Sequence, residues 1–65
     1  MLIRKKSPFT GEITEMEIDV AYYQLVNWER GDLIQNAMPN QTPEEREFIK
    51  TGITPAEWKK YIGDD

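Results

Sequence analysis

The clearest structural signal in this sequence is a helix-start pattern that occurs twice. Residues 42–45 read Thr-Pro-Glu-Glu and residues 54–57 read Thr-Pro-Ala-Glu. Each run places a threonine at the N-cap, a proline at the first helical position and a glutamate at the third, which together form a capping box. We expect one helix to run to about Thr51 and a last helix to run to about Ile62. The apolar positions around the two starts do not match, so the pattern indicates two similar helix starts rather than a repeat protein.

Apolar side chains recur at helical spacing in both segments, which predicts one buried side for each helix. We expect the inward side chains to be Phe48 and Ile49 in the first helix, and Trp58, Tyr61 and Ile62 in the second. Ile53 precedes the second cap, so it can form a hydrophobic staple with Trp58. Gly52 and Gly63 are suited to end the two helices.

The first part of the chain, residues 2–18, reads as a β-hairpin around the turn sequence Ser-Pro-Phe-Thr-Gly at residues 7–11. Pairing Ser7 with Glu12 places Ile3 opposite Met16 and Arg4 opposite Glu15. The apolar residues Ile3, Met16 and Ile18 then share one face, and charged residues occupy the other. A two-stranded hairpin is not stable alone in water, so helices must cover the apolar face.

Between these parts, Asp19 can cap a helix that ends near Arg30, with Gly31 as its stop. Residues 32–38 predict a further short helix, which Pro39 ends. The expected inward side chains are Ala21, Tyr22, Leu25 and Trp28 in the longer helix, and Leu33, Ile34 and Ala37 in the shorter one. The sequence therefore predicts one small α+β domain over residues 1–65, with a hairpin at 2–18 packed on three or four short helices within 19–62. The last two residues, Asp64 and Asp65, are expected to fray.

The amino-acid composition excludes several kinds of function but does not indicate a particular one. The 65 residues contain no Cys and no His. Disulfides, zinc sites built from Cys and His, and mechanisms that need a thiol or an imidazole are therefore excluded. No EF-hand spacing, phosphate loop, apolar signal segment or membrane-length apolar run is present. We expect a cytoplasmic protein that is not an enzyme, with no catalytic residues, no metal and no cofactor, and with the single serine, Ser7, as a turn former.

Charge offers one candidate nucleic-acid surface. Arg4, Lys5 and Lys6 adjoin Phe9, so this part of the hairpin could contact phosphates while the aromatic ring stacks on a base. The simpler interpretation is a strand whose cations balance glutamates of the opposite strand. The chain as a whole has a net charge of −4, which argues mildly against broad nucleic-acid binding.

Acidic residues also occur in the C-terminal half, at Glu44, Glu45, Glu47, Glu57, Asp64 and Asp65. Most of this charge is expected to form a solvated helical surface, with ion pairs between Glu47 and Lys50 and between Glu57 and Lys60. An acidic surface that binds a basic partner or mimics DNA is the alternative interpretation.

A resemblance covers roughly residues 28–62. The segments Leu-Ile-Gln-Asn-Ala-Met-Pro at 33–39, Glu-Arg-Glu-Phe at 45–48 and Thr-Gly-Ile at 51–53, followed by Trp58, resemble a group of small uncharacterised proteins encoded by bacteriophages and other mobile elements. The resemblance implies a phage-type context without a mechanism. Relatives often carry Cys near an N-terminal turn; this chain has none there, so a metal-binding hairpin is not implied.

Four residues are candidate contacts for a partner protein. Tyr23 is expected on the solvent side of its helix, and Arg30 lies at the C-terminal end of the same helix. Tyr and Arg are preferred interface residues. Gln35 and Arg46 belong to the phage-type pattern without an evident packing role, although Arg46 or Glu47 could bond back to backbone groups near Pro39.

These observations predict a small non-enzymatic protein-binding module that modulates or inhibits a host or viral protein in the bacterial cytoplasm. The alternative is a nucleic-acid accessory protein that uses Arg4, Lys5, Lys6 and Phe9. We expect no membrane partner, and either a monomer or a homodimer, because a second copy would add buried surface to a chain this small.

Overall fold

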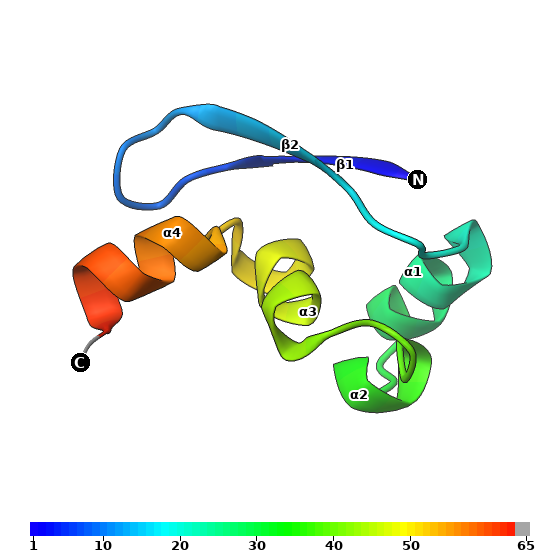
Figure 1. Ribbon diagram of the computed structural model, residues 1–65. Coiled ribbons are helices and arrows are strands. Elements are labelled where there is room, and N and C mark those ends of the chain that lie inside the picture. Colours follow the sequence, from blue (N-terminus) through cyan, green and yellow to red (C-terminus); the bar gives the residue numbers. More distant parts are fainter. Residues whose placement is uncertain (64–65) are drawn as a thin grey trace.

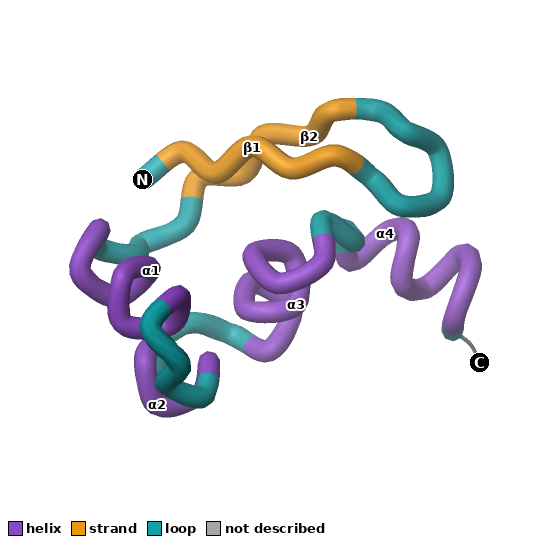
Figure 2. Tube along the Cα trace, turned by 180° about the vertical axis from the view of Figure 1, so that it is seen from behind, coloured by secondary structure: helices purple, strands orange, loops and turns teal. Residues whose placement is uncertain are grey.

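The computed structural model describes residues 1–63 and shows an N-terminal antiparallel hairpin lying over a row of helices (Figure 1). The expected fraying of Asp64 and Asp65 lies outside the described residues. The elements are β1 (Leu2–Lys6), β2 (Ile13–Glu17), α1 (Tyr22–Glu29), α2 (Ile34–Ala37), α3 (Pro43–Thr51), α4 (Pro55–Glu57) and a π-helical segment (Trp58–Ile62) that continues α4. We call residues 55–62 the C-terminal helix. Seen from behind, the helices again lie on one side of the hairpin (Figure 2). The α+β class is confirmed.

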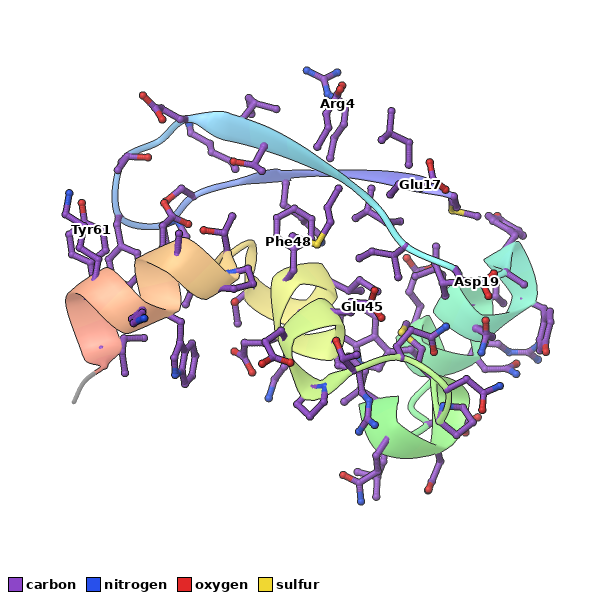
Figure 3. The ribbon with its side chains drawn as sticks, in the orientation of Figure 1. Arg4, Glu17, Asp19, Glu45, Phe48 and Tyr61 are labelled. Carbon is purple, nitrogen blue, oxygen red and sulfur yellow. The ribbon has the colours of Figure 1, made fainter. Side chains whose placement is uncertain are left out.

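The hairpin has the predicted register. Ile3 pairs with Met16 and Arg4 with Glu15, and the Ser7 N–H donates to the Glu12 carbonyl at 2.8 Å. Ile3 is buried against the helices, whereas Arg4 points away from them (Figure 3). Alternation along the strands thus separates a core face from a charged outer face.

The core lies between the apolar face of the hairpin and the helices. Phe48 of α3 is fully buried and points toward the hairpin (Figure 3). The other buried apolar residues are Ile3, Ile18, Val20, Ala37, Met38 and Ile49. Leu25 and Trp28 of α1 pack against this cluster while keeping part of their surface in solvent. Burial of Phe48 and Ile49 was predicted correctly.

The start of α1 differs from the prediction. Ala21, not Asp19, is the N-cap, and its N–H donates to Gln24 Oε1 at 2.7 Å. The chain stays extended before this point because Ile18 and Val20 are both buried in the core. The later start places Tyr22 in the first turn with 72% of its surface exposed, so its predicted core position is wrong. Ala21 is exposed as well.

The short helix α2 also packs differently from the prediction. Leu33 is its N-cap and is 62% exposed, so its predicted inward position is wrong. Met38, just before Pro39, is instead fully buried and fills that part of the core. Because Pro39 follows, Met38 leaves the helical region, with φ of −131° and ψ of +66°.

Helix α3 follows its sequence signals closely. Thr42 accepts from the Glu45 N–H at 3.1 Å, and Glu45 accepts from the Thr42 N–H at 3.0 Å, which completes the capping box. Gly52 ends the helix with φ of +84°, and a Cβ at this position would lie 2.7 Å from the carbonyl oxygen of Lys6. Glycine is therefore required both for the left-handed backbone and for the close approach of β1.

The C-terminal helix begins as predicted but does not bury its apolar side chains. Thr54 and Glu57 form the second capping box, with both bonds at 3.1 Å. Trp58, Tyr61 and Ile62 are 43%, 47% and 53% exposed, so their predicted core positions are wrong. The helix lies beneath the hairpin loop (Figure 1), and none of its residues belongs to the buried core cluster. Within residues 1–63, every helix is too short or too polar to cross a bilayer.

Candidate functional site

An apolar groove lies between the first turns of α3 and the exposed side of the C-terminal helix. Its volume is about 250 Å³, and its apolar lining comes from Pro43, Ile53, Pro55 and Trp58. Ile62 and Trp58 line an adjoining hollow, so the apolar surface continues along the C-terminal helix. Both hollows therefore combine the exposed Trp58 with other apolar side chains.

Local sequence explains why these residues meet. The two Thr-Pro starts place Pro43 and Pro55 at the first turns of their helices, where a proline needs no N–H partner. Gly52 turns the chain between the helices, which brings Ile53 and Trp58 to the same groove. Ile53 and Trp58 thus line the same open groove, and the hydrophobic staple between them stays a prediction.

One rim of the groove is acidic. Glu44 and Glu47, three residues apart on α3, both line it. Among residues 1–63, neither carboxylate has a lysine or arginine nitrogen within 4.0 Å; the ion pairs present join the Met1 amino group to Glu17 and Arg4 to Glu15. The expected Glu47–Lys50 and Glu57–Lys60 ion pairs are not formed. The groove therefore presents apolar surface beside two uncompensated negative charges.

The hairpin loop holds the other side of the C-terminal helix. The Ser7 hydroxyl donates to Glu57 Oε2 at 2.5 Å and accepts from the N–H groups of Phe9 and Thr10 at 3.1 and 3.2 Å. Phe9 stacks on Tyr61, with ring centroids 4.5 Å apart and planes inclined by 21°; Figure 3 shows Tyr61 beneath the loop. The hydrogen bond from Ser7, followed by those from Thr54, lowers the pKa of Glu57 below its usual value.

Sequence spacing explains how one helix can be held and exposed at once. Glu57 and Tyr61 are four positions apart and contact the hairpin loop. Trp58 and Ile62, also four positions apart, lie together on the groove side. Side chains four apart share a helix face, so the loop fixes one face and leaves the next one open.

The predicted partner-binding residues do not form one site. Tyr23 is 66% exposed, and Arg30, the C-cap of α1, is also exposed. Gln35 is exposed on α2. Arg46 is half-buried, and its Nε and Nη2 donate to the carbonyl of Gln41 at 3.2 and 3.0 Å. This contact gives Arg46 the backbone-bonding role considered above. No hydrogen bond or ion pair among the described residues joins any two of the four.

The predicted nucleic-acid residues are also divided. Arg4 lies on the outer face, with its Nε 3.1 Å from Glu15 Oε2. Lys6 is exposed, but Lys5 is half-buried on the opposite face, where its Cβ lies beside Gly52. One face of Phe9 is covered by Tyr61. The three cations therefore do not make one continuous patch, and the charge-balancing interpretation fits Arg4.

Sequence reasoning missed the groove because it assigned Trp58 and Ile62 to the core. Within residues 1–63, no cluster of three or more acidic side chains is arranged to hold a metal ion. Comparisons of this chain with protein-family models, with curated proteins and with solved structures find no significant match. The site is therefore interpreted from its own geometry.

Proposed function

We propose that this chain is a small protein-binding module of the bacteriophage or mobile-element type, which acts in the bacterial cytoplasm by occupying a host or viral protein. The observation that carries the proposal is the exposed apolar groove around Trp58. Tryptophan anchors many protein interfaces, because burial of its large ring removes much apolar surface from water. The chain acts by binding and performs no chemical step.

Two further features support a protein partner. Tyr23 and Arg30, seven positions apart on and at the end of α1, give a second exposed surface with residues common at interfaces. The divided cations of the hairpin and the covered ring of Phe9 make the nucleic-acid alternative weaker, because phosphate binding favours several cations on one surface.

The test is affinity capture from a bacterial lysate with the full chain as bait, in parallel nuclease-treated and untreated arms, read by mass spectrometry. The proposal predicts a protein that is retained after nuclease treatment and that binds the purified chain directly and saturably. If proteins are recovered only in the untreated arm, nucleic acid is the ligand and the proposal is wrong. If neither arm yields a direct binder, the proposal is likewise rejected.

A further inference from the structure

We propose that the groove binds a short segment of the partner in which a lysine or arginine adjoins an apolar side chain. The inference rests on the proposed function and names the chemistry of its ligand. It follows from two properties of the same surface, the apolar lining around Trp58 and the acidic rim formed by Glu44 and Glu47.

The apolar part of the ligand is indicated by the lining. Trp58 is 43% exposed, and Ile53, Pro43 and Pro55 lie around it. The volume of about 250 Å³ exceeds the roughly 30 Å³ that one water molecule occupies, so an apolar side chain would displace several waters. Removing this surface from water is the favourable term in such an association.

The cationic part of the ligand is indicated by the rim. Glu44 and Glu47 have no cationic partner within residues 1–63, and the chain carries a net charge of −4. A guanidinium or ammonium group placed here would lie near both carboxylates and beside the exposed tryptophan ring, which attracts cations through its face. An acidic ligand or a nucleic-acid phosphate would instead meet two like charges.

The ligand also has a preferred direction. Glu44 lines both the groove and the adjoining hollow, whereas Glu47 lines the groove and Lys59 lines the hollow. A cation is therefore favoured at the α3 end, and the apolar side chain is favoured between α3 and Ile62. This arrangement distinguishes a basic–apolar segment from a uniformly basic one, which would meet Lys59.

The experiment selects ligands without assuming a partner. A displayed library of random peptides of about twelve residues is panned on the full-length protein, and enriched peptides are synthesised for affinity measurement. We expect enriched peptides to pair Lys or Arg with Leu, Ile, Phe or Trp. Their affinity should fall at least about tenfold for Trp58→Ala and for the double variant Glu44→Lys with Glu47→Lys. It should also weaken as salt rises from about 0.05 to 0.5 M.

Matched variants separate the groove from the rest of the surface. Tyr22→Ala and Glu29→Lys change an exposed aromatic residue and an exposed glutamate on α1, and they should leave peptide affinity unchanged. Circular dichroism of each variant confirms that it is folded. Because all test positions in the groove are exposed or half-buried, these substitutions leave the core intact.

Several outcomes would overturn the inference. They are the absence of enriched peptides, enrichment of acidic peptides, and equal binding to wild type and Trp58→Ala. A chain that sediments as a dimer and becomes monomeric in Trp58→Ala would show that a second copy fills the groove, which is also contrary to the inference. After any of these results, a partner protein could still be captured through α1 in the nuclease-treated lysate. The peptide-binding inference can therefore be rejected while the proposed protein-binding function stands.

Discussion

Helix α3 and the C-terminal helix begin with the same chemistry and end in opposite environments. Each has a threonine N-cap, a proline in the first turn and a glutamate that completes the capping box. Yet Phe48 of α3 is fully buried, whereas Trp58 of the C-terminal helix is 43% exposed. The difference teaches that capping determines where a helix begins, while its position under the hairpin determines what it buries.

The contrast extends to how each helix is held. Apolar packing under β1 and the close approach of Gly52 hold α3, whereas the C-terminal helix is held by the Ser7–Glu57 hydrogen bond and the Phe9–Tyr61 stack. An attachment through one face leaves the Trp58 face available. Attachment through one face makes this helix a weak contributor to the core and leaves the proposed binding surface around Trp58 exposed.

The largest expected effect is the loss of the α3 core contact. Phe48→Ala should lower the free energy of unfolding by about 3–5 kcal/mol, because it removes a buried ring and leaves a cavity. Urea unfolding measures the change. A domain of this size has only about 3–5 kcal/mol in total, so Phe48→Leu serves as the milder variant that should remain folded and less stable than wild type. Wild-type stability in both variants would contradict the assigned core.

A smaller effect is expected where α3 meets the hairpin. Gly52→Ala should cost about 1–3 kcal/mol from backbone strain alone, and more from the clash of the new Cβ with the Lys6 carbonyl. Gly11→Ala is the matched control, because its φ of +78° is similar and the nearest atom is the end of the Lys6 side chain at 3.8 Å. Thermal unfolding should show the greater loss for Gly52→Ala; equal losses would contradict the close approach.

The two caps provide a direct pair. Thr42→Ala and Thr54→Ala each remove one capping hydroxyl, a change that costs about 0.5–2 kcal/mol. We expect Thr42→Ala to lower global stability, and Thr54→Ala mainly to increase local opening of the C-terminal helix. Native-state hydrogen exchange separates the two effects. Equal changes in the global unfolding free energy would mean that the C-terminal helix unfolds only with the core.

The attachment of the C-terminal helix should depend on pH. Hydrogen bonds from Ser7 and Thr54 favour the charged form of Glu57, so its pKa in the folded state lies below the ordinary value of 4.5. Its contribution to stability is therefore complete above about pH 4.5 and is lost as pH falls through the lowered pKa. The difference in melting temperature between wild type and Glu57→Gln should shrink as the pH falls from about 4.5 through the lowered pKa of Glu57. A difference that grows on acidification would contradict the sign.

The smallest effect on stability is expected at the groove. Trp58→Ala should change the free energy of unfolding by no more than about 0.5 kcal/mol, because 43% of its surface is exposed and it lies outside the buried core cluster. Trp28→Ala should cost more, since Trp28 packs against the core cluster. Urea unfolding of the two variants compares them. A large loss for Trp58→Ala would show that the ring belongs to the core after all.

Sequence reasoning worked where the decisive forces are local. The hairpin register follows from alternation and the turn at Ser7, and both capping boxes follow from residue types at fixed spacing. The buried positions of Phe48 and Ile49 follow from the spacing within α3.

It failed where the outcome depends on distant parts of the chain. Tyr22 and Leu33 are exposed because Val20 and Met38 take the core positions instead. No sequence signal shows that Ser7 meets Glu57, 50 residues away, or that this contact turns Trp58 toward solvent. The groove was missed for the same reason, because the spacing of apolar residues on a helix does not show whether another part of the chain covers them.

The central claim, that Trp58 belongs to an open groove and Trp28 to the edge of the core, is tested most directly by tryptophan fluorescence quenching. Trp28→Phe leaves Trp58 as the single tryptophan, and Trp58→Phe leaves Trp28. The structure predicts that acrylamide quenches Trp58 more readily and that its emission lies at longer wavelength. If Trp58 is shielded as well as Trp28 or better, the groove is closed in solution and the account is wrong.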